Sequence, residues 1–346
     1  MRVEELEERT KEQGKGVHYV AEVRNGMVEG LHRVHIAVVN SGGKLLFSSG
    51  DPYLVTYSRS CIKPIQALPL LIRGAADRYG LSGREIAIIC GSHSGQNDHL
   101  AAVRSVLDKG GLEEKMLKCK GHKPFDKQTA TKIGEGYTPL HDNCSGKHAG
   151  ALLLSKYMGW DLESYLDPEH PIQKEILEVI TSLTGMDADD IHLGTDGCDI
   201  PNHAFPLNKM AMMFALLIEP SDHVLEPHLR RIGRAMLDHP FMVGGEKRFD
   251  TVIMRDNGGS ILSKAGAAGL QTVAVRRKED TIGISLKIED GAYSPIPPLT
   301  YSILRELGVG VESSERGDEF ALGPIKTRSK KVVGSNVVVG EMVEHI

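Results

Sequence analysis

The sequence lacks several features that would place it in a special class of protein. Its longest apolar runs, such as MAMMFALLI at 210–218, are far shorter than the roughly 20 residues that a membrane-spanning helix needs. It has no basic stripe and no long acidic block, and its net charge of −5 arises from interspersed charges of both signs. We therefore expect neither a nucleic-acid partner nor a membrane partner.

Cysteine is scarce and unsuited to a disulfide framework. The chain has five, an odd number at irregular spacing: Cys61, Cys90, Cys119, Cys144 and Cys198. The first 16 residues are acidic and lack an apolar core, so they do not read as a signal peptide. These features favour a cytoplasmic protein with reduced thiols, free to bind a metal, to react or to fill the core.

The order of the predicted elements indicates one α+β domain. Residues 1–16 read as a frayed or helical extension, and we expect a single domain at 17–346 with a helical subregion at about 64–240. The alternation of polar and apolar residues predicts strands at 32–40, 44–50, 272–277 and 281–290, with strand-like runs in 251–266. Strands at both ends with helices between them predict an antiparallel sheet formed by both chain ends and packed with the helical region.

Apolar residues at helical spacing predict the elements of the middle of the chain. Helices are expected at 64–80, 98–111, 170–185, 208–218, 226–240 and 297–310. Pro64 suits a first helical turn, whereas Pro69 within the same run is expected to kink or split the helix. The segment 82–95 fits either a helix or a strand.

Four short runs concentrate reactive and ligating side chains. They are SRSCIKPIQ at 58–66, CGSHSG at 90–95, HDNCSGKHAG at 141–150 and GTDGCDIPNHAFP at 194–206. In the first, Ser60 and Lys63 are three residues apart at a predicted helix start, so a neutral lysine could take the serine proton. The pattern alone is weak, because a capping serine followed by a solvated lysine gives the same spacing.

The thiols of the third and fourth runs suggest a metal site less strongly. Cys144 lies near a predicted helix start, where the pKa of a thiol is lowered, and Cys198 lies in a turn beside Asp196. The two lack the Cys-x-x-Cys spacing of zinc ribbons, and each alone is more often a small buried side chain. His93 lies in a polar, glycine-rich run. Lys264 fits two interpretations, an ordinary lysine at the end of a strand or a ligand for a substrate carboxylate.

Taken together, the motifs carry a resemblance. SRSCIKPIQALPLL, CGSHSG, HDNCSGKHAGALL, GTDGC, SKAGAAG and KIEDG occur in this order over about 34–307, and they resemble the asparaginase II family of the rhizobial type. The resemblance implies a fold similar to that of serine β-lactamases, penicillin-binding proteins and glutaminases. It also implies an amidohydrolase that converts L-asparagine to L-aspartate and ammonia through an acyl-enzyme.

The resemblance also suggests roles for individual residues. It implies catalysis by Ser60, Lys63 and Ser92, with neutral Lys63 taking the proton of Ser60. It further implies zinc held by Cys144, Lys147 and Cys198. We expect four further residues to contact the substrate: Arg59, His93, Asp196 and Lys264. A homodimer is also expected.

Two departures keep alternatives open. Position 61 is cysteine where a small residue such as alanine is expected, and Ala268 stands where an acidic residue is common. The alternatives are another serine–lysine amidase of the glutaminase or penicillin-recognising type, a Cys144 nucleophile with Ser60 structural, and a zinc-stabilised binding protein that has lost activity.

Overall fold

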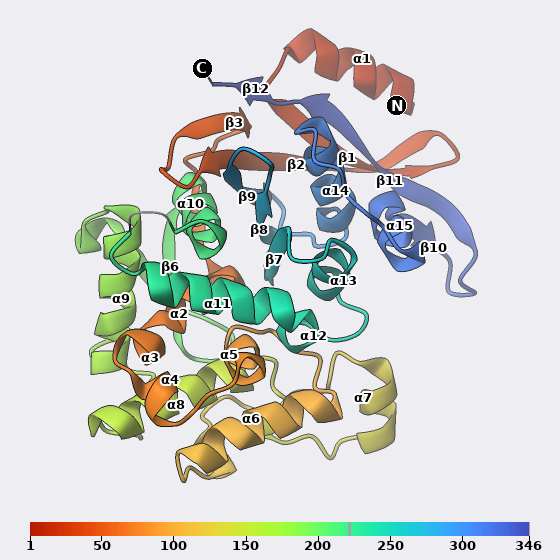
Figure 1. Cartoon of the computed structure of the whole chain (residues 1–346). Coiled ribbons are helices and arrows are strands. Elements are labelled where there is room, and N and C mark those ends of the chain that lie inside the picture. Colours follow the sequence, from red (N-terminus) through yellow and green to blue (C-terminus); the bar gives the residue numbers. More distant parts are fainter. Residues whose placement is uncertain (221–222, 346) are drawn as a thin grey trace.

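A large antiparallel sheet organises the protein. The computed structural model describes residues 1–220 and 223–345. Within them, nine strands form this sheet in the order β10-β11-β1-β2-β9-β8-β7, with β3 pairing to β2 and β12 pairing to β3 (Figure 1). The strands are β1 Val17–Arg24, β2 Met27–Asn40, β3 Leu45–Ser49, β7 Ile261–Gly266, β8 Leu270–Arg276, β9 Thr281–Ile288, β10 Pro324–Lys326, β11 Val332–Glu341 and β12 Val343–Glu344. Both chain ends therefore build the sheet, which confirms the predicted α+β class.

The helices fill the middle of the chain and cover the sheet. They are α1 Val3–Gln13, α2 Lys63–Gln66, α3 Leu68–Ile72, α4 Ala75–Arg78, α5 Gly83–Ile89, α6 Asn97–Lys109, α7 Lys127–Ile133, α8 Ser145–Met158, α9 Pro171–Thr184, α10 Leu207–Ile218, α11 Glu226–Asp238, α12 Pro240–Val243, α13 Phe249–Asp256, α14 Ile296–Glu306 and α15 Glu315–Leu322. A small sheet of order β4-β6-β5 lies among them, made of β4 Val55–Tyr57, β5 His192–Thr195 and β6 Pro201–Pro206. No helix among the described residues is long and apolar enough to cross a membrane.

Helices pack on both faces of the large sheet. Ala37 and Val39 of β2 belong to the same apolar cluster as α10, whereas the alternating Ile36 and Val38 face the cluster of α13 and α14. Helix α10 approaches β9 very closely, because a Cβ atom at Gly283 would lie 1.9 Å from the carbonyl oxygen of Ala211. Glycine at this position lets the helix lie against the strand.

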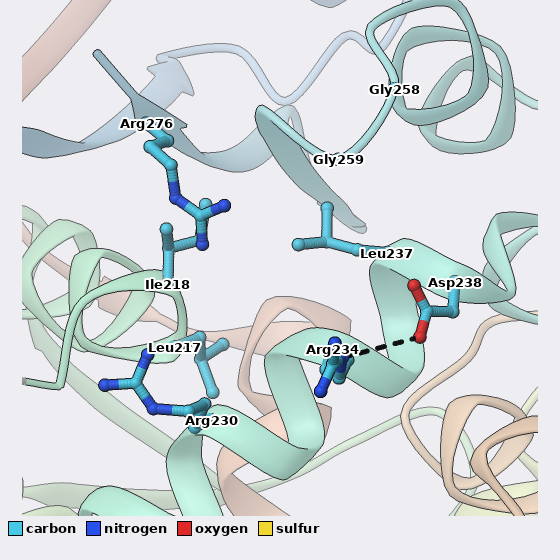
Figure 2. A pocket seen from close by; sticks show the side chains of 9 residues that line it. All are labelled: Leu217, Ile218, Arg230, Arg234, Leu237, Asp238, Gly258, Gly259 and Arg276. Carbon is cyan, nitrogen blue, oxygen red and sulfur yellow. Dashed lines mark ion pairs between the residues drawn. The ribbon is translucent and has the colours of Figure 1, made fainter. Parts of the chain in front are cut away.

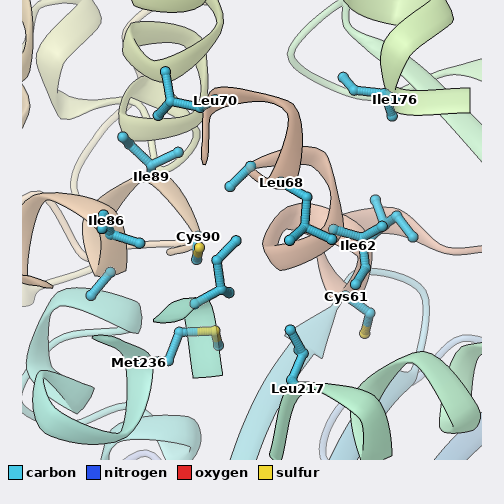
Figure 3. Packing of buried hydrophobic residues seen from close by; sticks show 14 of the residues in the cluster. Cys61, Ile62, Leu68, Leu70, Ile86, Ile89, Cys90, Ile176, Leu217 and Met236 are labelled. Atoms are coloured by element: carbon cyan, nitrogen blue, oxygen red, sulfur yellow. The ribbon is translucent and has the colours of Figure 1, made fainter. Parts of the chain in front are cut away.

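The larger apolar cluster joins this helix layer to the segments that carry the motifs. Figure 3 shows Cys61 and Cys90 within it, beside Ile62, Leu68 and Met236. Burial raises the pKa of each of these two thiols to about 12, so both stay protonated at neutral pH. Cys61 and Cys90 therefore act as small buried side chains, and their packing holds the first two motifs in the apolar cluster.

The structure corrects two of the sequence predictions. The segment 251–256, predicted as strand-like, belongs to helix α13, and the strand β7 begins only after Asn257-Gly258-Gly259. Apolar residues of a short buried helix and of a strand look alike in sequence. The prediction also missed β1, which pairs with both β2 and β11.

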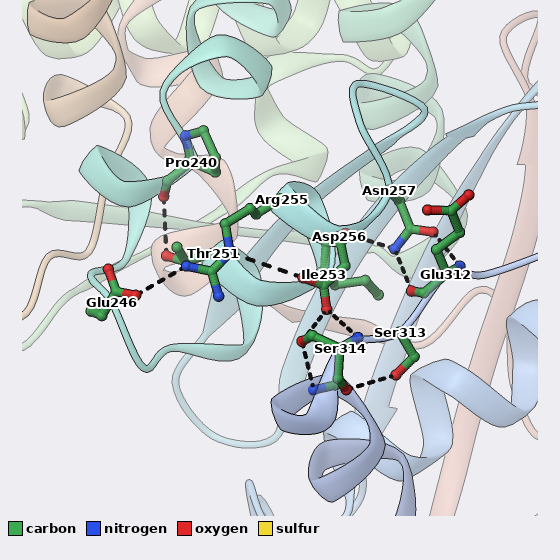
Figure 4. A network of polar contacts seen from close by, with 11 residues as sticks. Pro240, Glu246, Thr251, Ile253, Arg255, Asp256, Asn257, Glu312, Ser313 and Ser314 are labelled. Carbon is green, nitrogen blue, oxygen red and sulfur yellow. Dashed lines mark hydrogen bonds and ion pairs between the residues drawn. The ribbon is translucent and has the colours of Figure 1, made fainter.

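Polar contacts at the end of α13 attach it to the chain before α15. The Asp256 carboxylate accepts hydrogen bonds from the backbone N–H (3.0 Å) and hydroxyl (2.6 Å) of Ser314, and the Asn257 side chain accepts one from Glu312 N–H (2.9 Å) (Figure 4). These bonds fix the point at which the chain leaves the helix and enters β7. They therefore help to place the strand that carries Lys264.

Two smaller predictions agree with the structure. The helix predicted at 64–80 is divided among α2, α3 and α4, and Pro69 lies in the first turn of α3. This agrees with the expectation that Pro69 kinks or splits the helix. Residues 1–16 contain the helix α1, which packs the buried Leu6 against apolar residues of β1 and β11. This contact attaches the extension to the large sheet at β1 and β11.

Candidate active site

Lys63 joins three of the four motifs through one buried amine. Its Nζ donates hydrogen bonds to Gly91 O (2.7 Å), to Ser92 Oγ (2.9 Å) and to Asn143 O (3.2 Å). The side chain is 1% exposed. Three acceptors are the number that one ammonium group can satisfy, so Lys63 is fully engaged with protein groups.

Ser92 lies between two lysines. Lys264 Nζ approaches Ser92 Oγ to 3.0 Å from the side of β7 and donates a second hydrogen bond to Ala265 O (2.7 Å). Burial lowers the pKa of Lys264 to about 8; Asp250 opposes this shift, and the charge of Lys63 adds to it. A large share of Lys264 is therefore neutral at mildly alkaline pH, as a proton acceptor requires.

Ser60 lies on a strained turn at the start of this region. The 3₁₀ turn Arg59–Ile62 leads directly into α2, and Arg59 has a φ of +48°, a left-handed conformation that costs a non-glycine residue roughly 1–3 kcal/mol. The Ser60 side chain is half-buried. Among the described residues no hydrogen bond joins Lys63 to Ser60, because the three contacts of the Lys63 amine go to other groups.

Polar contacts hold Arg59 in this conformation and connect it to the fourth motif. Its backbone N–H donates to Asn202 Oδ1 (3.1 Å), and its Nε lies 2.9 Å from Asp196 Oδ1. Burial alone would raise the pKa of Asp196, but the charges of Lys147 and Arg59 outweigh it and hold the pKa below its usual value. Asn202 was not predicted; only its place inside the fourth motif pointed to it.

The unexpected Cys61 links the Ser60 turn to the strand of Lys264. Its thiol donates a hydrogen bond to Lys264 O (3.2 Å), and a Cβ atom at Gly266 would lie 3.0 Å from its sulfur. A cysteine is therefore accommodated here, and it holds the two candidate catalytic segments together.

The three predicted metal ligands lie in one buried cluster. Lys147 Nζ donates to Cys198 Sγ (3.2 Å), and a hydrogen bond from the Cys198 thiol to Cys144 holds the pKa of Cys144 well below that of an ordinary thiol. Burial would lower the pKa of Lys147, but the two sulfurs and Asp196 outweigh it and raise the pKa. The two sulfurs and the amine therefore lie close enough to shift one another's pKa.

The donors of this cluster fit a soft divalent metal such as zinc. Thiolate sulfur and amine nitrogen are both zinc ligands once they are deprotonated. Among the described residues, no group of three or more His, Cys, Asp or Glu side chains is placed to hold a metal ion. A zinc site here therefore depends on Lys147 as the third ligand.

His93 lies behind the site with both ring nitrogens in use. Gly95 N–H donates to Nδ1 (3.2 Å), so Nε2 carries the proton and donates to Ser145 Oγ (2.9 Å). Complete burial lowers the pKa of His93 well below its usual value and keeps the ring neutral. In this arrangement His93 fixes the start of α8, and a direct contact with substrate stays a prediction.

Asp250 is a buried carboxylate that the sequence gave no reason to select. It accepts hydrogen bonds from Ser263 Oγ (2.7 Å), Ala265 N–H (2.9 Å) and Gln271 Nε2 (3.0 Å). The two residues that flank Lys264 on β7 are thereby fixed to α13. No signal in the sequence could have found it, since the helix itself was predicted as strand.

The fold and the buried Lys63–Ser92–Lys264 cluster define a candidate serine–lysine hydrolase. The family model described as L-asparaginase II matches residues 20–338, most of the chain, and the protein belongs to this family. It is therefore an amidohydrolase. A search of the curated proteins found no significant match.

Comparison with solved structures found distant similarities. The chain is similar to a Bacillus subtilis glutaminase in covalent complex with 5-oxo-L-norleucine, at 12% identity and a TM-score of 0.39, over 80% of this chain and 88% of that one. It is also similar to a beta-lactamase from Sphaerobacter thermophilus, at 13% identity and a TM-score of 0.42, over 80% and 92% of the two chains.

Proposed function

We propose that this amidohydrolase is an L-asparaginase that works through a covalent aspartyl-enzyme. The observation that carries the proposal is the pair of buried lysines on Ser92 Oγ, beside a strained turn that presents Ser60. Family membership supports the amide substrate, and the convergence of Lys63, Ser92 and Lys264 supports serine–lysine chemistry.

Ser60 is the proposed nucleophile. Its Oγ forms a bond to the side-chain amide carbon of asparagine while its proton passes to the lysine–serine cluster. The C–N bond then breaks, and that proton leaves with the nitrogen as ammonia. Water next attacks the aspartyl ester, gives one proton back to Ser60 and releases L-aspartate.

The lysines and Ser92 are assigned distinct parts. Lys264 is the better proton acceptor, because its amine has one carbonyl contact besides Ser92 and its pKa lies near 8. Lys63, with three acceptors, is the donor that orients Ser92. Ser92 then passes the proton from Ser60 to Lys264, so it needs no direct contact with the amide carbon.

Zinc remains a second part of the proposal. Cys144, Lys147 and Cys198 would hold the ion, which would orient the substrate and stiffen the pocket. The neighbouring Asp196 is paired with Arg59 and so connects this cluster to the Ser60 turn. We propose that Arg59 recognises the α-carboxylate of asparagine and that Asp196 recognises its α-ammonium group.

The test is ammonia release from L-asparagine and from L-glutamine. Wild type should hydrolyse asparagine, and Ser60→Ala should lose at least a thousandfold in rate because the nucleophile is gone. Ser92→Ala should lose about 10²–10⁴-fold, the usual contribution of a proton relay. Ser329→Ala, an exposed serine far along the chain, is the matched control and should retain full rate.

Other results would redirect the assignment. Preference for glutamine would keep the chemistry and replace the substrate. A Ser60→Ala variant that keeps most of its rate would sink the nucleophile assignment and favour Ser92, whose hydroxyl has the lysine contacts. The proposed homodimer is tested separately by light scattering of the purified protein.

A further inference from the structure

A cavity lined by three arginines lies apart from the serine–lysine cluster. Its volume is about 380 Å³, and it is bounded by the end of α10, by α11, by the turn before β7 and by the end of β8 (Figure 2). None of its lining residues belongs to the four motifs or to Lys264. Its chemistry is therefore independent of the proposed amide hydrolysis.

The arginines reach the cavity from two sides. Arg230 and Arg234 lie one turn apart on α11 and so share a face of this helix, and Arg276 is the last residue of β8. Figure 2 shows Arg276 extending from the strand toward the side of the cavity formed by α11. Arginines of α11 and of β8 therefore line the same cavity.

These guanidinium groups are available for a ligand. Arg230 pairs with Glu226 at 2.9 Å and Arg234 with Asp238 at 3.9 Å, both between exposed side chains at i and i+4. Ion pairs between exposed side chains contribute little to stability, so a bound anion can replace them. Within the described part of the chain, Arg276 has no ion pair.

The remaining walls give the cavity depth and an apolar side. Leu217, Ile218 and Leu237 line it, so a ligand would bury carbon as well as charge. Gly258 and Gly259 adopt φ values of +45° and +87°, and a Cβ atom at either would meet nothing within 4 Å. The glycine turn therefore leaves this wall open instead of filling it with side chains.

We infer that this cavity binds a small organic anion with at least two carboxylate or phosphate groups. Arginine forks bind such groups through paired hydrogen bonds, and the three arginines still exceed the two carboxylates that pair with them, Glu226 and Asp238. The volume falls in the range of small-molecule sites, and the leucine and isoleucine wall accommodates the carbon skeleton of a metabolite.

Isothermal titration calorimetry with citrate and with pyrophosphate tests the inference on the full-length protein. At least one probe should bind, and the tighter one identifies carboxylate or phosphate as the preferred group. Arg276→Gln should weaken this binding at least tenfold, and so should the double variant Arg230→Gln/Arg234→Gln. Circular dichroism checks that both variants remain folded.

The matched control is Arg104→Gln, which removes another exposed arginine that is paired with a carboxylate, Glu114. It should bind the probe as wild type does. The inference is overturned if neither probe binds, or if Arg104→Gln weakens binding as much as the cavity variants do, since that result indicates general attraction to surface charge.

Discussion

Burial of the Lys264 amine should lower the free energy of unfolding. The substitution Lys264→Met should recover part of this loss, and the amount recovered should depend on pH. The pKa of Lys264 is lowered from 10.5 to about 8 in the folded protein. Because the unfolded chain binds the proton more tightly, the cost is fully present below pH 8. It is relieved as pH rises from about 8 through 10.5. At pH 7 the shift corresponds to about 3 kcal/mol, at 1.36 kcal/mol per pKa unit.

Lys264→Met also removes the contacts to Ser92 and Ala265 O, which are worth about 1 kcal/mol each. The net gain in the free energy of unfolding at pH 7 is therefore about 1 kcal/mol. Between pH 7 and pH 10, wild type should become more stable relative to the variant by about 2–3 kcal/mol. This change with pH does not depend on the value of the lost hydrogen bonds.

Urea unfolding of both proteins at several pH values measures the difference. Lys156→Met is the matched control, because it makes the same substitution at an exposed site of α8. Its stability relative to wild type should stay constant over this range. A Lys264→Met difference that is the same at pH 7 and pH 10 would refute the depressed pKa, and with it the proposed role of Lys264 as proton acceptor.

Three further predictions concern Lys264, Cys198 and Gly283. The rate of asparagine hydrolysis, measured as ammonia release, should rise from about pH 7 to about pH 9 and then level off as Lys264 loses its proton; a flat profile would count against Lys264. Cys198→Ser should lower the zinc content of the purified protein, measured by atomic absorption; unchanged zinc content would remove Cys198 from the ligand set. Gly283→Ala should lower the unfolding free energy by about 1–3 kcal/mol in urea titrations, because its Cβ would collide with Ala211 O; unchanged stability would contradict the close packing of α10 on β9.

The sequence predicted the parts of the site that lie within short motifs. Ser60 and Lys63 were selected by their spacing together with the family resemblance, and Ser92 was selected through the resemblance; the structure brings Lys63 and Ser92 together. The strands 32–40, 44–50, 272–277 and 281–290 were also predicted, since their alternation is local. Such features depend on neighbours within a few residues, which a single sequence displays directly.

What the sequence could not predict depends on contacts between distant segments. Whether Lys63 reaches Ser60 or Ser92 is decided by the carbonyls of Gly91 and Asn143, which are 28 and 80 residues away. Asp250 supports Lys264 from a helix whose apolar residues resemble those of a strand. The lowered pKa of Lys264 results from burial, and strand spacing alone does not reveal it.

The most direct test of the account is to trap the acyl-enzyme. Wild-type protein is mixed with L-asparagine, quenched in acid within the first turnover and examined by intact-mass and peptide mass spectrometry. The account predicts an added mass of one aspartyl group on the peptide that contains Ser60, and none in Ser60→Ala. An adduct on the peptide of Ser92 or Cys144, or turnover with no adduct at any time, would contradict it.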